Sequence, residues 1–149
     1  MKILLDINVV LDLLLARQIF AMEAKKLMQQ AIRDEIEVYV TSSSMNTLVY
    51  FMEKTIGYAK TRGIITNFLQ IAKGIDIAMS DIQKAFANTA VTDTEDAILM
   101  QGAIKGDMDL ILTRDHDFCQ VQGQKVPVTT PSEYLGRLTC VCGHTIKPL

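Results

Sequence analysis

Residues 2–6, Lys-Ile-Leu-Leu-Asp, form a short aliphatic run that ends in an acid, and residues 110–115, Leu-Ile-Leu-Thr-Arg-Asp, repeat that design far along the chain. Continuous aliphatic runs of this length are typical of parallel strands that are buried on both faces. Longer amphipathic stretches separate the runs, as the crossover helices of a parallel sheet require. We therefore expect an α/β fold, a three-layer α/β/α sandwich with a mainly parallel central sheet.

The same periodicity places the other elements. Strands are expected at residues 2–6, 37–40, 75–78, 109–113 and 126–128, and helices from about residue 8, at 19–34, from the candidate caps Ser42–Ser44 to about 54, at 60–73, after 80, at about 93–105 and from 131. The helix at 60–73 is expected to bury Ile64, Ile65, Phe68, Leu69 and Ala72 and to end at Gly74. Ser80 with Gln83, and Thr130 with Pro131 and Glu133, have the spacing of helix starts.

Composition limits the class of protein. The 149 residues, 49% hydrophobic and 21% charged, fit one compact domain, expected over residues 1–138 with a tail at 139–149. The net charge of -2 gives no global attraction to nucleic acid or anionic lipid. Three cysteines favour a reducing cytoplasm over a secreted disulfide framework. The apolar start carries three polar residues (Asp6, Asn8 and Asp12), unlike a signal peptide, and no run reaches membrane-spanning length, so no membrane association is expected.

Acidic residues follow the strands or open the helices next to them. Asp6 ends the first strand, three acids (Asp93, Glu95 and Asp96) open the helix before the 109–113 strand, and Asp115 and Asp117 follow that strand. In an open parallel sheet ligands bind beyond the carboxyl ends of the strands. Carboxylates gathered there repel one another unless they are protonated or share a cation, and oxygen ligands select Mg²⁺ or Mn²⁺. Such an ion suits attack of water on a phosphodiester.

Several of these residues also have structural interpretations. Asp93 is well placed to cap its helix, and Asn8 can cap the first helix or hydrogen-bond to Asp6. Asp12 is expected to face solvent or to form a local salt link. Asp115 is an ordinary turn former, and Asp117 can cap the turn at Phe118.

Three blocks together resemble the PIN-domain nucleases: Leu4-Leu5-Asp6-Ile7-Asn8-Val9-Val10-Leu11-Asp12, Asp93-Thr-Glu-Asp96-Ala97, and Ile111-Leu-Thr-Arg114-Asp115-His-Asp117-Phe118. The closing Thr130-Pro131-Ser132-Glu133-Tyr134-Leu135 also looks like the end of that family. Among PIN proteins the chain looks most like the VapC-type toxins. The resemblance implies a Mg²⁺- or Mn²⁺-dependent endoribonuclease that acts on RNA, is often a homodimer, and is restrained by a cognate antitoxin that inserts a segment near the acidic crevice.

Carried over to this chain, the resemblance makes Asp6, Asp96 and Asp115 the metal ligands and catalytic residues. Four residues (Asn8, Asn46, Asp93 and Asp117) are expected to be auxiliary. The chain departs from the family in the helix after the second strand, where a Glu is usual and Asn46 is the nearest polar residue. An amide oxygen can ligate a hard cation but brings neither charge nor basicity, so metal affinity is expected to fall.

The candidates for RNA contact are Arg17 and Arg114, and the second also has an ion pair with a neighbouring acid as its structural role. Tyr50 and Phe51 lie among aliphatic residues at helical spacing, which indicates a core position or a helix-mediated dimer contact. The tail motif Cys140-Val-Cys142-Gly-His144 is a weak zinc pattern, and a frayed terminus is the simpler interpretation.

Other functions fit parts of the pattern. Asp6-Ile-Asn8 resembles the nucleophile motif of haloacid-dehalogenase phosphatases, with Asp109 as a mimic of their late acid. A phosphoacceptor receiver domain has similar size but needs an acceptor Asp at the end of its third strand. A PIN scaffold that binds RNA or a partner without cutting is the non-enzymatic alternative.

Overall fold

A parallel sheet organises the computed structural model, which describes residues 1–140, with side chains through 137. Within these residues five strands, all parallel, lie in the order β3-β2-β1-β4-β5. Their bounds are β1 Lys2–Leu5, β2 Glu37–Thr41, β3 Lys73–Ile75, β4 Leu110–Leu112 and β5 Val128–Thr129. The expected α/β class and the mainly parallel sheet are confirmed.

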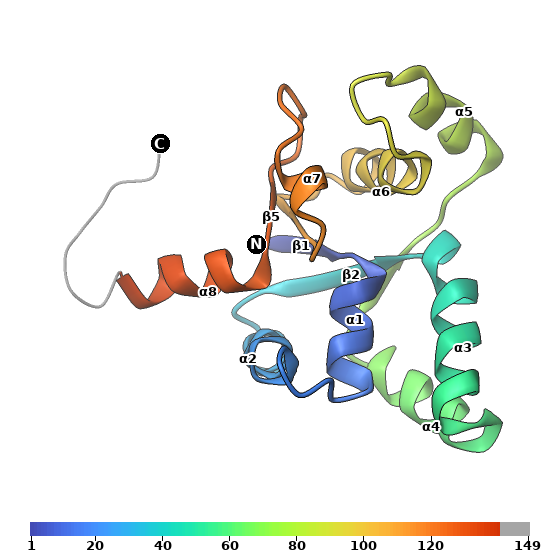
Figure 1. Ribbon diagram of the computed structural model, residues 1–149, viewed down its shortest axis with the longest axis vertical. Helices are drawn as coiled ribbons and strands as arrows, with labels where there is room; N and C mark the ends of the chain where they lie inside the picture. Colours follow the sequence, from blue (N-terminus) through green and yellow to red (C-terminus); the bar gives the residue numbers. More distant parts are fainter. Residues whose placement is uncertain (141–149) are drawn as a thin grey trace.

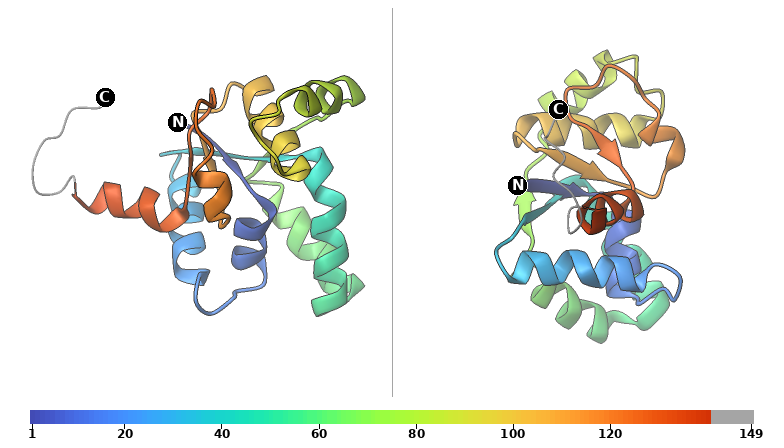
Figure 2. Two further views of the ribbon diagram at one scale, coloured as in Figure 1. Left: turned by 45° about the horizontal axis from the view of Figure 1, so that its top comes forward. Right: turned by 90° about the vertical axis from the view of Figure 1, so that its left-hand side faces the viewer.

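Helices cover both faces of this sheet (Figures 1 and 2). Their bounds are α1 Ile7–Leu14, α2 Ala21–Ile32, α3 Ser42–Ile56, α4 Tyr58–Phe68, α5 Met79–Ala87, α6 Thr94–Lys105, α7 His116–Cys119 and α8 Pro131–Cys140. The helices α1 to α4 lie on one face, and α5 to α7 lie on the other. The first residues of α8 pack with α1 and α2 through Tyr134. The three-layer arrangement is therefore that of an α/β/α sandwich.

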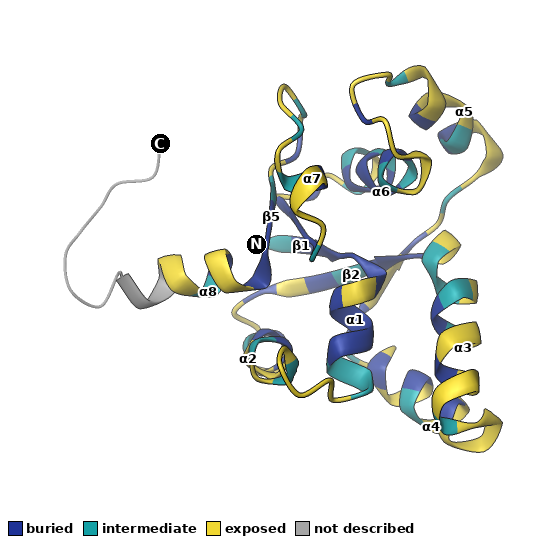
Figure 3. Cartoon of the chain, viewed as in Figure 1, coloured by how far each residue is buried: buried dark blue, intermediate teal, exposed yellow. Residues whose placement is uncertain are grey.

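Alternation along β1 explains why this strand lies at the centre. Ile3 and Leu5 point into the core beneath α1 to α4, whereas Leu4 points into the core beneath α6. All three side chains are at most 2% exposed, and Figure 3 shows β1 coloured as buried beyond its intermediate first part. A strand that is apolar on both faces loses most if either face is left in water, so it takes the position with a neighbour on each edge and helices on each side.

The third strand departs from the expectation. The α4 helix ends at Phe68, a turn follows, and Gly74 lies inside β3 instead of ending a helix. Leu69, expected to be buried, is 44% exposed because the helix has already ended. A three-residue strand that contains glycine has almost no period-two signal, so the longer helical pattern before it dominated the prediction.

Helix starts were predicted with mixed success. Ser80 does not open α5: the helix begins at Met79, and the Asp81 carboxylate accepts the Ala78 N–H at 2.9 Å. Thr41, rather than Ser42–Ser44, caps α3 by accepting the Ser44 N–H. The expected cap at Thr130 is present, since its hydroxyl accepts the Glu133 N–H.

The close packing of α6 on the sheet depends on Gly102. A Cβ atom at this position would lie 2.9 Å from the Thr41 side chain and 3.1 Å from that of Ile77. Only the absence of a side chain lets the helix approach β2 this closely. This close packing fixes the separation between the sheet and α6. The carboxyl ends of the strands and the start of α6 form part of the candidate site.

The last helix crosses the predicted boundary at residue 138, because α8 continues to Cys140. The motif at Cys140, Cys142 and His144 lies outside the residues whose side chains the structure describes. None of the described helices combines the length and apolar character that crossing a membrane requires.

Candidate active site

The reversal of strand order lies between β1 and β4, the two central strands. From β1 the chain passes to α1 on one face, and from β4 it passes to α7 on the other face. The Asp6 N–H donates to the Leu112 carbonyl at 2.9 Å, which locks the ends of these strands together. In a doubly wound sheet this switch point is where the crevice opens. Asp6 and the residues after Leu112 therefore border it by topology alone.

A cavity of about 320 Å³ occupies this position. Its wall brings together the end of β1, the starts of α1, α3 and α6, and the loop after β4. The polar residues that line it are Asp6, Asn8, Ser43, Ser44, Asp93, Thr94, Glu95, Asp96 and Asp115. Three widely separated acidic blocks of the sequence thus share one cavity, and no Lys, Arg or His is among the described lining residues.

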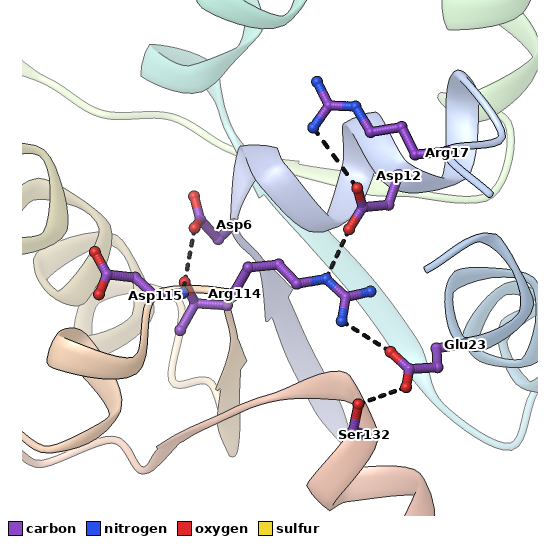
Figure 4. Close-up of polar contacts among 8 residues, drawn as sticks. Asp6, Asp12, Arg17, Glu23, Arg114, Asp115 and Ser132 are labelled. Carbon is purple, nitrogen blue, oxygen red and sulfur yellow. Dashed lines mark hydrogen bonds and ion pairs between the residues drawn. The ribbon is translucent and has the colours of Figure 1, made fainter. Parts of the chain in front are cut away.

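Asp6 is the most buried acid of the cavity, at 9% exposure. Its carboxylate accepts the Thr113 hydroxyl at 2.8 Å, shown in Figure 4. Burial raises the pKa of Asp6 above its ordinary value, while hydrogen bonds from Thr113, Ile7 and Asn8 favour the charged form and the nearby Asp115 opposes it. Asn8 lies inside α1 instead of capping it, because the helix begins at Ile7. The Asn8 side chain acts to lower the pKa of Asp6.

Asp96 has the most perturbed acidity of the site. Partial burial, followed by the charges of Asp93, Asp115, Asp6 and Glu95, raises the pKa of Asp96 from its ordinary value of 3.8 to about 7. Asp93 caps α6 as expected, and its Oδ1 accepts the N–H groups of Glu95 and Asp96 at 2.9 and 3.1 Å. The cap therefore also presents a carboxylate to the cavity, so the structural role and the site role of Asp93 coincide.

Asp115 likewise both caps a helix and lines the cavity. Its Oδ1 accepts the N–H groups of Asp117 and Phe118 at 2.8 and 3.2 Å, which starts α7. Asp115 and Asp96 also line a second hollow of about 360 Å³. Asp117 lies on that second hollow and not on the first, so the two cavities meet along the acids they share.

The donor set fits a hard divalent cation. Carboxylates and hydroxyls line the cavity, and no cationic side chain among the described residues neutralises them there. Burial first, and then repulsion from the neighbouring carboxylates, raises the pKa of Asp96, and a bound cation would relieve that repulsion. Among the described residues, no three His, Cys, Asp or Glu side chains stand close enough together to hold a metal directly. Mg²⁺ is commonly bound through only one or two carboxylates and keeps several waters, so this spacing is compatible with it.

Not every candidate lies on the cavity. Asn46 is exposed and absent from the lining, where α3 contributes Ser43 and Ser44. Asp12 is 2% exposed instead of facing solvent, and its salt link is confirmed: it pairs with Arg114 at 2.7 Å and with Arg17 at 3.6 Å. Both arginines expected near RNA are thus engaged with an acid outside the cavity.

Sequence reasoning missed several residues of the site. The sequence predicts Ser43 and Ser44 only as candidate helix caps, yet both line the cavity. Thr113 was not singled out, although a hydroxyl that ends an all-aliphatic strand next to Asp115 is a detectable signal. Nothing in the sequence pairs Asp12 with Arg114, because their contact depends on the fold.

Topology argues against the other phosphate chemistries. Asp109 lies at the amino end of β4, where its Oδ2 accepts the Lys2 N–H, so it is at the opposite end of the sheet from Asp6. A receiver-type sheet has its third strand next to the first, whereas here β3 is an edge strand. Neither rival arrangement is therefore formed.

The fold and the cavity together define an α/β protein with an acid-lined site at its switch point. A family model described as PIN domain matches residues 2–117, so the chain belongs to the PIN domain family. The resemblance seen in the sequence is thereby confirmed. No curated protein matches the sequence.

Three solved structures show the same fold. VapBC2 from Rickettsia felis, bound to a DNA fragment from the promoter, is 13% identical with a TM-score of 0.68, over 87% of this chain and 98% of that one. VapC20 of Mycobacterium tuberculosis, described as a Sarcin-Ricin loop cleaving toxin, is 14% identical with a TM-score of 0.65, over 84% and 98%. A toxin-antitoxin complex from Klebsiella pneumoniae is 21% identical with a TM-score of 0.62, over 86% and 96%.

Proposed function

We propose that this PIN domain is a metal-dependent endoribonuclease that uses Mg²⁺ or Mn²⁺ and acts as the toxin of a toxin–antitoxin pair. The observation that carries the proposal is the cavity in which Asp6, Asp96 and Asp115 meet without a cationic side chain. The negative charge of this cavity repels a polyanion such as RNA unless a bound cation first neutralises the carboxylates. The structural similarity to a Sarcin-Ricin loop cleaving toxin and to a toxin-antitoxin complex supports the same function.

The proposed roles follow from position. Asp6, Asp96 and Asp115 would hold the cation in part through its bound waters, and the cation would supply an activated water and balance charge on the phosphodiester. Asp6 is fixed by Thr113, and Asp115 is fixed by the α7 N–H groups, so both oxygen donors are oriented before a ligand arrives. Three further residues are auxiliary: Asn8, Asp93 and Asp117.

Asp6→Asn tests the nuclease directly. The substitution keeps the size of the side chain, and the raised pKa of Asp6 means that a neutral group is tolerated there, so the variant is expected to fold. We expect the wild type to cleave RNA with added Mg²⁺ or Mn²⁺ and not in EDTA, and the variant to lose this cleavage. Asp107→Asn is the matched control, because Asp107 is exposed, lies away from the cavity lining and has a left-handed backbone (φ 53°) that Asn accepts. Equal cleavage by wild type and Asp6→Asn would refute the proposal.

One observation favours a scaffold that binds without cutting. The α3 wall of the cavity contributes hydroxyls at Ser43 and Ser44 and no acid, which lowers the negative charge available to a cation. A wild type that takes up no Mg²⁺ or Mn²⁺ in calorimetry and cuts no RNA, yet binds RNA or a partner, would establish this alternative.

The partners follow from the same proposal. We expect RNA as substrate, hence action in the cytoplasm, and a cognate antitoxin that inserts a segment near the acidic cavity. We also expect a homodimer in which α3 takes part, because Tyr50 and Phe51 on this helix are 53% and 46% exposed. Light scattering that gives a monomer mass at assay concentration would contradict the dimer, and Phe51→Ser is expected to convert a dimer to monomer.

A further inference from the structure

The three residues after β4 have different surroundings. Thr113 donates its hydroxyl to Asp6 and accepts the Asp115 N–H at 3.0 Å, so its contacts are with the acidic cavity. Figure 4 shows the Arg114 side chain extending away from Asp6 and Asp115, toward α1 and α2. Arg114, the middle residue of this segment, is therefore held by contacts outside the acidic cavity, whereas its two neighbours are part of the site.

Arg114 is held at several points. Its Nε donates to Asp12 at 2.7 Å, and its Nη1 donates to Glu23 at 2.8 Å. Its guanidinium lies 3.7 Å from the centre of the Phe20 ring. Only 15% of the Arg114 side chain is exposed, and Nη2 is buried without a hydrogen-bond partner among the described residues. A guanidinium that served only as a surface charge would be exposed, with its N–H groups hydrogen-bonded to water. The burial of Arg114 therefore indicates a structural role.

The partners of Arg114 are themselves fixed. Asp12 lies in α1, with 3% of its side chain exposed, and an unpaired carboxylate there would be costly. Although partial burial acts to raise it, hydrogen bonds from Ser132 and Arg114 hold the pKa of Glu23 below its ordinary value. Arg114 thus joins the loop after β4 to α1, to α2 and, through Glu23 and Ser132, to α8.

We infer that Arg114 is a positioning residue: anchored by Asp12 and Glu23, it holds the 113–115 segment so that Asp115 and the Thr113–Asp6 pair face one another across the cavity. The inference rests on the proposed function and assigns Arg114 a role other than RNA contact. Releasing Arg114 to a phosphate would leave the buried Asp12 without its nearest cation, because Arg17 is 3.6 Å away and 46% exposed.

If Arg114 positions the loop through its ion pair with Asp12, replacing Arg114 or replacing Asp12 should have the same kind of effect. We expect Arg114→Gln and Asp12→Asn each to lower kcat and Mn²⁺ affinity by about 10- to 100-fold, the range for residues that orient metal ligands. The double variant should be no worse than Arg114→Gln alone, since that substitution already removes the ion pair with Asp12. The KM for RNA should stay within about twofold, because the substrate does not touch this pair. Arg114→Lys, which can reach only one of the two acids, should be intermediate.

A readout without metal or RNA separates this inference from the proposed function. Hydrogen exchange of the Asp115 and Phe118 amides reports the loop directly, since these N–H groups bond within it. We expect faster exchange of both amides in Arg114→Gln and Asp12→Asn, and no change in Arg33→Gln, which breaks an exposed Arg–Glu pair at 4.0 Å. If Arg114→Gln does not fold, Arg114→Lys and Asp12→Asn give the same reading.

Three results would overturn the inference. The first is unchanged exchange at both amides. The second is an Arg114→Gln variant with raised KM and a weaker salt dependence of RNA binding, alongside an Asp12→Asn variant with normal kcat, which would make Arg114 an RNA contact. The third is additivity of the two substitutions. A wild type that neither binds Mn²⁺ nor cuts RNA would defeat the proposed function, while the exchange experiment would still decide whether Arg114 positions the loop.

Discussion

Replacing Asp96 by Asn should stabilise the metal-free protein at alkaline pH. The pKa of Asp96 is raised from 3.8 to about 7, first by burial and then by four neighbouring carboxylates. Folding therefore disfavours the ionised form of this side chain. An amide of the same shape carries no charge, so Asp96→Asn removes the repulsion and keeps the packing.

The sign and size of the effect follow from linkage. Near pH 4 and below, Asp96 holds its proton in the folded state and the penalty is small. As the pH rises from about 4 to about 7, the unfolded chain ionises before the folded one, so stability falls, and above about pH 7 the loss is constant. A difference of about 3 between the two pKa values corresponds to about 4 kcal/mol. Solvent screening at this partly exposed carboxylate reduces that figure to about 2 kcal/mol.

Urea unfolding in EDTA provides the assay. We expect Asp96→Asn to exceed the wild type in free energy of unfolding by about 2 kcal/mol at pH 8 and to match it near pH 4. Saturating Mn²⁺ should stabilise the wild type more than the variant and shrink the difference. A variant equal to or less stable than the wild type at pH 8 in EDTA would refute the account of the acidic cavity as a site of stored repulsion.

Three other substitutions test separate features. Thr113→Val removes the donor to Asp6 at constant shape and should cost about 1–3 kcal/mol in urea unfolding, whereas Thr113→Ser should cost less; equal losses would show that the hydroxyl is unimportant. Ser43→Glu should raise Mn²⁺ affinity in calorimetry more than Asn46→Glu does, because only the first position lines the cavity; the reverse order would place the cation nearer Asn46. Gly102→Ala should destabilise by about 1–3 kcal/mol despite the better helix propensity of Ala, and a gain in melting temperature would show that α6 can move off the sheet.

Local signals were sufficient for much of the fold. The aliphatic runs at β1 and β4 could only be buried strands, and their position at the centre of the sheet follows from that. Asp93 has cap spacing in the sequence and caps α6 in the structure, whereas Asp115, expected as a turn former, caps α7 in place of Asp117. These features depend on neighbours within a few residues, which a linear pattern records. The three acidic blocks also predicted their common cavity, because strand ends in a parallel sheet meet by topology.

Other features depend on long-range contacts and were not predictable from pattern alone. Asp12 lies one helical turn after Asn8 and looks like a surface residue, yet it is buried because Arg114 reaches it from the other end of the chain. The short strand β3 exists because β2 supplies its hydrogen bonds, not because residues 73–75 favour extension. Ser43 and Asn46 are three residues apart on one helix, yet only Ser43 lines the cavity, and the sequence pattern does not predict this difference.

The pairing of β1 with β4 also governs when the cavity can exist during synthesis. The Leu112 carbonyl and the Thr113 hydroxyl that hold Asp6 are translated more than a hundred residues after it. Until that segment emerges, the acidic wall lacks Asp115, and the central strand β1 lacks β4, one of its two neighbours. Whatever chemistry the cavity performs, it cannot begin before residues 110–115 have been made and have paired with β1.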